Sequence, residues 1–263
     1  MNVYLMVDIE GISGIYSRAQ VTLDGGRFNE GRRYMTDDIN ACIKGLKEAG
    51  VDKIYVRDCH GASHAVIWEE ISPDADYIIS GSTGEKRFMG VEDCDAVILL
   101  GYHAMAGTQG GVLEHTFSSK SFQNVWMNGE KAGEVALDAG MLGDMGKPVI
   151  MVSGDDKVCA EAKTVLPDTV TAEVKKGCGT FGAMLLPREK AHKLIAEKAK
   201  EAVEKFKDIK PYVVSKPVEI KVEYIERAAL PKMIAHEGME HIDGRTVKTS
   251  ADSVEKAFMK ATD

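Results

Sequence analysis

Two carboxylates and a glycine stand directly after the first apolar run of the chain. Residues 3–7 have the length and character of a buried strand, and Asp8, Glu10 and Gly11 follow at once. Side chains two apart on a strand point to the same face, so Asp8 and Glu10 can converge on one cation. Acidic residues at a strand end are also often simply exposed to water. This pair alone leaves open whether the two carboxylates are solvated or bind a metal.

Two later strand-like runs end in related chemistry. Residues 53–58 lead into Asp58 and His60, and residues 95–100 lead into His103. In an open α/β sheet, ligands bind beyond the carboxyl ends of the strands, and parallel strands bring these ends to one edge. Carboxylate oxygens and imidazole nitrogens without a thiolate cluster suit zinc or another divalent transition metal. The three strand ends therefore predict a metal site at one edge of the sheet.

The elements that must position these groups alternate between strands and helices. Strands are expected at residues 3–7, 53–58, 77–80, 96–100, 149–153 and 170–175, and helices at 30–49, 133–144, 155–165 and 187–206. The sequence Asn128-Gly129 predicts a β-hairpin over residues 122–131. The alternation predicts an α/β fold with a mostly parallel sheet and helices on both faces.

The pattern changes after Pro211. Residues 213–224 alternate as a β segment, residues 228–235 read as a short helix, and a polar strand near 245–249 precedes a last helix. We therefore expect two parts: an α/β metal-binding catalytic domain at residues 1–210 and a small α+β subdomain at residues 211–263.

Composition excludes several classes of function. The 33 basic and 41 acidic side chains give a net charge of −8, and no basic stretch resembles a nucleic-acid footprint. No apolar run is long enough to span a bilayer, and Asp8 interrupts the only apolar run near the N-terminus. The five cysteines are odd in number and form no CxxC pair: Cys42, Cys59, Cys94, Cys159 and Cys178. We expect a cytoplasmic protein with reduced thiols and no nucleic-acid or membrane partner.

Six short motifs occur together in an order and at spacings that resemble one known family. They are Asp8-Ile-Glu10-Gly11-Ile12-Ser13-Gly14, Asp58-Cys59-His60, Gly101-Tyr102-His103-Ala104, the segment around His115, Gly133-Glu134 and Gly154-Asp155-Asp156. With these motifs the sequence resembles the DppA-type D-aminopeptidases, a family of zinc metallopeptidases. The resemblance covers most of the chain and is strongest over residues 1–165.

The resemblance implies a centre with two zinc ions per subunit and assigns its residues. The implied metal ligands are Asp8, Glu10, His60, His103 and Glu134, with Asp8 between the ions. The implied catalytic residue is His115, whose unperturbed pKa near 6.5 suits general acid–base work. We favour acid–base work or oxyanion stabilisation over nucleophilic attack, because a metal-bound hydroxide would already supply the nucleophile. Glu134 follows from the resemblance alone, because a glutamate in the first turn of a helix more often serves the helix dipole.

The implied function is that of a zinc-dependent aminopeptidase, which removes the N-terminal residue of short peptides, D-amino-acid peptides among them. The implied assembly is a ring-shaped homo-oligomer of decamer-like size. Two features depart from the family: the loop from His103 to His115 is one residue longer, and residues 177–183 are unusually rich in glycine. Both could line the substrate pocket.

Two other interpretations stay open. One is a different dinuclear hydrolase that cleaves a phosphoester or a non-peptide amide, and four arginines keep it open: Arg18, Arg27, Arg32 and Arg33. The other is a non-catalytic metal-binding module.

Overall fold

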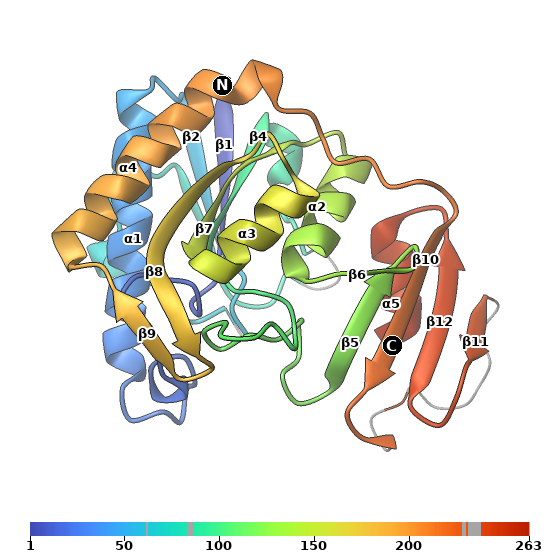
Figure 1. The fold of residues 1–263 in the computed structure, drawn as a ribbon. Coiled ribbons are helices and arrows are strands. Elements are labelled where there is room, and N and C mark those ends of the chain that lie inside the picture. Colours follow the sequence, from blue (N-terminus) through green and yellow to red (C-terminus); the bar gives the residue numbers. More distant parts are fainter. Residues whose placement is uncertain (62, 84–86, 228–229, 231–237, 263) are drawn as a thin grey trace.

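A seven-stranded sheet forms the centre of the larger part of the molecule (Figure 1). The computed structural model describes residues 1–263 except 62, 84–86, 228–229, 231–237 and 263. The strand order is β3-β2-β1-β4-β7-β8-β9, parallel throughout except for the last pair. The strands are β1 (Asn2–Val7), β2 (Lys53–Asp58), β3 (Tyr77–Ile79), β4 (Ala96–Tyr102), β7 (Val149–Asp155), β8 (Val170–Gly179) and β9 (Gly182–Leu185).

Helices cover both faces of this sheet, which confirms the predicted fold class. The α-helices are α1 (Phe28–Glu48), α2 (Glu134–Asp144), α3 (Asp156–Val165), α4 (Arg188–Lys205) and α5 (Val254–Thr262). Short 3-10 turns occur at η1 (Arg18–Gln20), η2 (Trp68–Glu70), η3 (Val91–Asp93) and η4 (Phe206–Asp208). Along β1, Val3 and Leu5 pack with α1 and α4, whereas Tyr4 and Met6 pack in the core that includes α2 and α3. Alternate side chains of one strand thus fill two separate cores.

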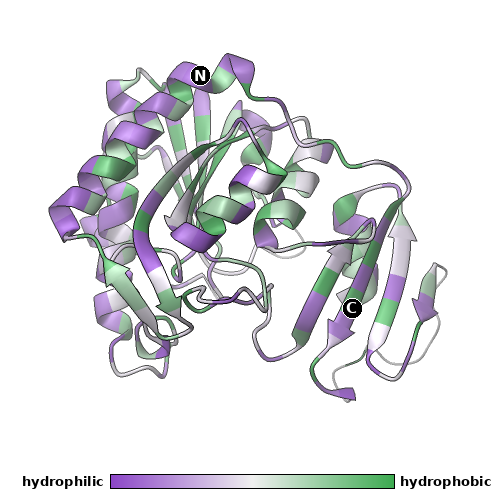
Figure 2. Cartoon of the chain, in the orientation of Figure 1, coloured by the Kyte–Doolittle hydropathy of each residue, from purple (hydrophilic) through white to green (hydrophobic). Residues whose placement is uncertain are grey.

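The helix α4 shows how the sequence pattern produces this packing. Its buried residues recur every three or four positions: Ala191, Ile195, Ala199 and Ala202. Figure 2 shows hydrophobic and hydrophilic residues interleaved along this helix, as expected where one face is buried and the other is in water. None of the helices in the described part of the chain combines the length and apolar character needed to cross a bilayer.

A second, antiparallel sheet lies beside the first, with α5 packed on it (Figure 1). Its order is β11-β12-β10-β5-β6, and its strands are β5 (Phe122–Met127), β6 (Glu130–Lys131), β10 (Val218–Tyr224), β11 (Met239–His241) and β12 (Thr246–Ala251). The predicted hairpin is present as β5 and β6, with positive φ angles at Asn128 and Gly129. Because β5 pairs with β10, this sheet contains strands from both sides of the expected boundary near Pro211. The two-domain division therefore stays a prediction. The helix predicted at 228–235 lies, apart from Leu230, outside the described residues.

The strand order creates a switch point between β1 and β4. The chain runs from β1 outward through β2 to β3 and then crosses to β4 on the other side of β1. In such sheets the ligand crevice opens beyond the carboxyl ends of the strands at this point. Two glycines let the strand ends approach: the Gly11 N–H donates to the Gly101 carbonyl at 2.7 Å, and a Cβ on Gly11 would lie 1.9 Å from the Tyr102 carbonyl oxygen. The carboxylates after β1 therefore lie beside the histidine after β4.

Candidate active site

The switch point gathers all six predicted site residues. Asp8 and Glu10 follow β1, His60 follows β2, His103 follows β4, His115 lies in the loop before β5, and Glu134 begins α2. Five of the six line one cavity of about 960 Å³, and His103 lies buried behind it.

The first half of the site joins His60 to two carboxylates. Its Nδ1 lies 3.0 Å from Asp8 Oδ1 and 3.1 Å from Glu10 Oε2. Its Nε2 lies 2.7 Å from the Val21 carbonyl oxygen, which accepts a hydrogen bond only from a protonated Nε2. This contact fixes the tautomer and leaves the Nδ1 lone pair facing the carboxylates, as is usual for histidines that bind metals. Asp58 instead accepts backbone N–H groups of residues 60, 65 and 66, so it orders the loop that carries His60.

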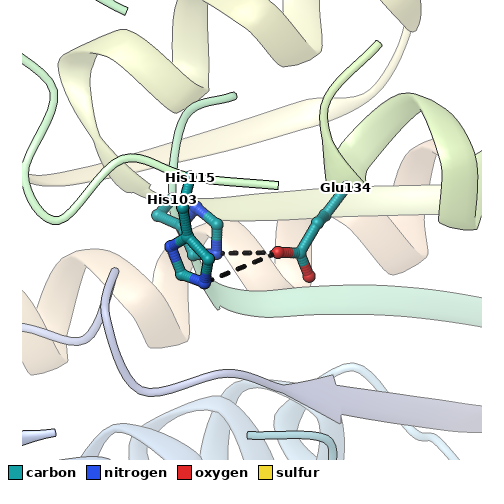
Figure 3. A group of neighbouring side chains, drawn as sticks. All are labelled: His103, His115 and Glu134. Atoms are coloured by element: carbon teal, nitrogen blue, oxygen red, sulfur yellow. Dashed lines mark ion pairs between the residues drawn. The ribbon is translucent and has the colours of Figure 1, made fainter. Parts of the chain in front are cut away.

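The second half brings two histidines to one glutamate. Nε2 of His103 lies 3.1 Å from Glu134 Oε1 and 3.4 Å from Asp8 Oδ2, and Nε2 of His115 lies 3.9 Å from Glu134 Oε1. The two rings stack at 3.9 Å between centroids and 12° between planes (Figure 3). Each Nδ1 donates to a backbone carbonyl, that of Ala104 or Leu113, so both Nε2 lone pairs face the site.

Two ligand atoms in this cluster are buried without a hydrogen bond to any described residue. Glu10 Oε2 and His103 Nε2 have no hydrogen-bond partner among the described residues, although buried polar atoms are normally satisfied. Two sets of described residues place donor atoms close enough to share one ion: Asp8, Glu10 and His103, and His103, His115 and Glu134. Carboxylate oxygens and neutral imidazole nitrogens are a donor set that zinc accepts. The residues present therefore fit the metal that the resemblance implies.

The second set differs from the roles implied by the resemblance. It includes His115, for which no ligand role is predicted, and His60 belongs to neither set. His60 nevertheless has its Nδ1 within 3.1 Å of two carboxylates. The division of ligands between two ions and the role of His115 remain predictions.

The electrostatics of the cluster favour added positive charge. Burial opposes protonation of His60 and His103, but Glu10 and Asp8 raise the pKa of the first, and Glu134 and Asp8 raise the pKa of the second. Burial would raise the pKa of Asp8, yet the neighbouring imidazoles of His103 and His60 hold it well below its usual range. A site that draws protons onto its histidines also favours divalent cations, which compete with protons for the same lone pairs.

The structure adds an ion-pair network behind Glu134 that the sequence analysis missed. Arg87 donates to buried Asp138 at 2.6 and 2.8 Å, and the Tyr102 hydroxyl donates to the same carboxylate at 2.7 Å. One signal was available, since Asp138 is an acidic residue within the otherwise apolar stretch of α2 at residues 135–142. Nothing in the sequence marks Arg87 as its partner.

A buried lysine holds the segment that carries Glu10. The Lys175 ammonium donates to the carbonyls of Glu10, Ile12 and Ile15 at 2.6, 2.9 and 2.8 Å. Burial lowers its pKa to about 7. Lys175 lies on β8, far along the chain, and its presence among buried strand residues was the only sequence signal for it.

Both segments that depart from the family line the cavity. Leu113 and Glu114 come from the longer loop, and Thr180 and Phe181 come from the glycine-rich turn between β8 and β9. The Leu113 N–H donates to the Thr180 carbonyl at 2.9 Å, which joins the two segments.

Paired carboxylates and imidazoles at the switch point of an α/β sheet fit the class of metal-dependent hydrolases. The sequence profile of one family, described as D-aminopeptidase, matches residues 1–261. A D-aminopeptidase of Bacillus subtilis (strain 168) is 34% identical over 217 residues, which cover 80% of this chain and 77% of the relative. A solved structure described as "Zn-dependent D-aminopeptidase DppA from Bacillus subtilis, a self-compartmentalizing protease" superposes with a TM-score of 0.91. It is 29% identical, and the match covers 98% of this chain and 94% of that one.

The chain belongs to the D-aminopeptidase family. This membership confirms the resemblance, and with it the predicted enzyme class, a metallo-aminopeptidase.

Proposed function

We propose that this chain is a zinc-dependent aminopeptidase that cleaves the N-terminal residue from short peptides, D-amino-acid peptides among them. The observation that carries the proposal is the convergence of Asp8, Glu10, His60, His103 and Glu134 at the switch point. Glu10 Oε2 and His103 Nε2 are buried there without a hydrogen bond to any described residue. Both relatives are described as D-aminopeptidases, and the solved one as Zn-dependent.

The chain's own residues divide the work. Asp8 directs one oxygen toward His60 and the other toward His103, so it is placed to hold two cations, with Glu10 and His60 on one side and His103 and Glu134 on the other. Bound there, zinc would supply an activated water and polarise the scissile carbonyl. His115, partly exposed to the cavity with its Nε2 toward the centre, is placed to hold or deliver a proton to the leaving amine.

The phosphoesterase alternative is weaker in the structure than in the sequence. Arg32 donates to the carbonyls of Ala65 and Val66, and Arg27 pairs with Glu30, so two of the four arginines already have partners. Arg18 lines the cavity but is exposed. The described part of the cavity wall thus holds no cluster of arginines for a phosphate group.

We further infer a ring-shaped homo-oligomer of decamer-like size in the cytoplasm. The assembly is inferred from the solved relative, which is described as self-compartmentalizing. The location is inferred from the five cysteines, all free thiols.

The proposed function is tested by incubating the zinc-loaded protein with D- and L-amino-acid amides, matched dipeptides and a phosphate monoester. We expect release of the N-terminal residue from amides and dipeptides and no phosphate release. Phosphate release without amide cleavage would select the phosphoesterase. Tight zinc binding without hydrolysis of any substrate would select the non-catalytic module.

A further inference from the structure

Arg87 presents a rigid cation beside the candidate metal ligands. Its Nε and Nη2 donate to the two oxygens of Asp138, which is fully buried and also accepts the Tyr102 hydroxyl. The guanidinium also lies over the Phe117 ring, 4.5 Å from its centroid. A bidentate pair and a stacked ring fix the orientation of the guanidinium, so little conformational entropy is lost when it binds a second group.

The free edge of this guanidinium borders the cavity. Arg87 lines the same cavity as Asp8, His115 and Glu134, and its side chain is 23% exposed. Nη1 makes no hydrogen bond or ion pair with any described residue, and Nη2 lies 3.8 Å from Glu134 Oε2. Nη1 is therefore available as a hydrogen-bond donor, and the guanidinium lies next to the carboxylate of Glu134, a candidate metal ligand.

We propose that Arg87 binds the terminal carboxylate of a dipeptide substrate, an inference that rests on the proposed function and specifies its substrate class. In a dipeptide only the amide nitrogen and one Cα separate the scissile carbonyl carbon from the carboxylate carbon. A group that recognises this carboxylate must therefore lie close to the ligands that position the carbonyl. Arg87 meets this condition, and each added residue in a longer peptide would move the carboxylate farther from it.

Few other cationic groups around the cavity could bind the terminal carboxylate of the substrate. The wall is largely acidic, with Asp8, Glu10, Asp24, Glu114 and Glu134 among its residues, so a substrate carboxylate there needs a fixed cation. Arg18 and Lys120 also line the wall, but both are exposed to water and their side chains make no ion pair with described residues. Exposed charges are screened by water and salt, whereas a half-buried guanidinium keeps its field.

The test compares one dipeptide with the same dipeptide carrying a C-terminal amide. The wild-type enzyme should have the higher kcat/KM on the free acid. Arg87→Gln should lower kcat/KM on the acid by about 10- to 100-fold, the loss typical of a charge-assisted hydrogen bond, and change the amide little. Arg87→Lys keeps the charge without the planar fork and should give an intermediate acid-to-amide ratio. Arg18→Gln removes a charge from the same cavity and should leave the ratio unchanged.

The acid-to-amide ratio is measured within each variant, so it does not depend on how much of the protein is folded. An unchanged ratio in Arg87→Gln, with equal losses on both substrates and reduced zinc content, would overturn the proposal and assign Arg87 to the positioning of Glu134. A wild-type enzyme equally active on acid and amide would also overturn it, while leaving the aminopeptidase intact. A wild-type enzyme inactive on both would overturn the proposed function and this inference together.

Discussion

The two oxygens of Asp8 face different imidazoles, so we expect Asp8 to bridge the two metal positions. Oδ1 lies 3.0 Å from His60 Nδ1, and Oδ2 lies 3.4 Å from His103 Nε2. We expect Asp8→Ala to lose both zinc ions, whereas Glu134→Ala should lose mainly one. Elemental analysis of the purified variants measures this directly, and two equivalents of zinc in Asp8→Ala would refute the bridging role.

A substitution at His115 distinguishes a role in proton transfer from a role in metal binding. If it acts only as a general acid–base, His115→Ala should keep its zinc and its fold while kcat falls by about 10²- to 10⁴-fold. His64→Ala is a matched control, because His64 is an exposed histidine on the wall of the same cavity. Loss of zinc from His115→Ala would instead make His115 a ligand beside His103 and Glu134, an arrangement that the geometry also permits.

For single residues, the sequence predicts those site residues that directly follow a recognisable strand. Asp8, Glu10, His60 and His103 stand at the ends of recognisable strands, so their types and positions indicate a metal site. Glu134 begins a helix and was assigned only through the family resemblance. Arg87 and Lys175 reach the site through tertiary contacts with Asp138 and with the segment after β1, which no local pattern encodes.

Among the elements, the segment after β1 is tied to β8 by one buried side chain, that of Lys175. Lys175 supplies donors to three buried carbonyls, so Lys175→Met leaves acceptors without partners and frees the backbone that carries Glu10. We expect the free energy of unfolding to fall by about 2–4 kcal/mol and zinc affinity to weaken. Urea unfolding and zinc titration measure the two effects. Lys176→Met, at the exposed next residue of the strand, should change neither, and equal behaviour of the two variants would contradict this role.

Glu161 on α3 connects the segments that carry His103 and Glu134, and it makes stability depend on pH. Its Oε2 accepts the Met105 N–H at 2.8 Å, and its Oε1 lies 2.2 Å from where a Cβ on Gly133 would be. Burial raises its pKa from 4.5 to about 7. Between these values the folded protein binds more protons than the unfolded chain, so this group lowers stability as pH rises through the window.

Glu161→Gln should remove this dependence, because an amide mimics the protonated carboxyl at every pH. In zinc-free protein, the free energy of unfolding of the variant relative to wild type should rise by up to about 3 kcal/mol between about pH 5 and about pH 8. Urea unfolding at the two pH values measures the difference. A constant difference between variant and wild type would show that Glu161 is not protonated in the folded protein.

The helices and strands themselves were largely predictable, because hydrophobic periodicity and the glycine and proline residues at their ends are local sequence features. The helix expected at residues 30–49 is α1 at Phe28–Glu48, and the one expected at 187–206 is α4 at Arg188–Lys205. The pairing of β5 with β10 was not predictable, since residues 122–127 and 218–224 are distant in sequence and each alternates as an ordinary strand. Strand partners are selected by tertiary packing, which a single sequence does not display.

For the whole molecule, the proposed ring predicts a large particle with protected active sites. Trp68 is 74% exposed on the protomer, so this large apolar side chain is a candidate subunit contact. We expect light scattering to give a mass well above that of a dimer, with activity on short peptides and none on folded proteins. A stable, fully active monomer of 28.6 kDa would refute the assembly and leave the metal site untouched.

The central claim is that the cluster around Asp8 holds zinc and that this zinc carries the hydrolysis. The most direct measurement is a zinc titration of chelator-treated enzyme, with the rate of dipeptide hydrolysis followed at each addition. The rate should be negligible without metal, rise with added zinc until two equivalents are bound, and stay negligible at every zinc concentration in Asp8→Ala. Full hydrolysis by the metal-free enzyme, or zinc-dependent activity in Asp8→Ala equal to wild type, would contradict it.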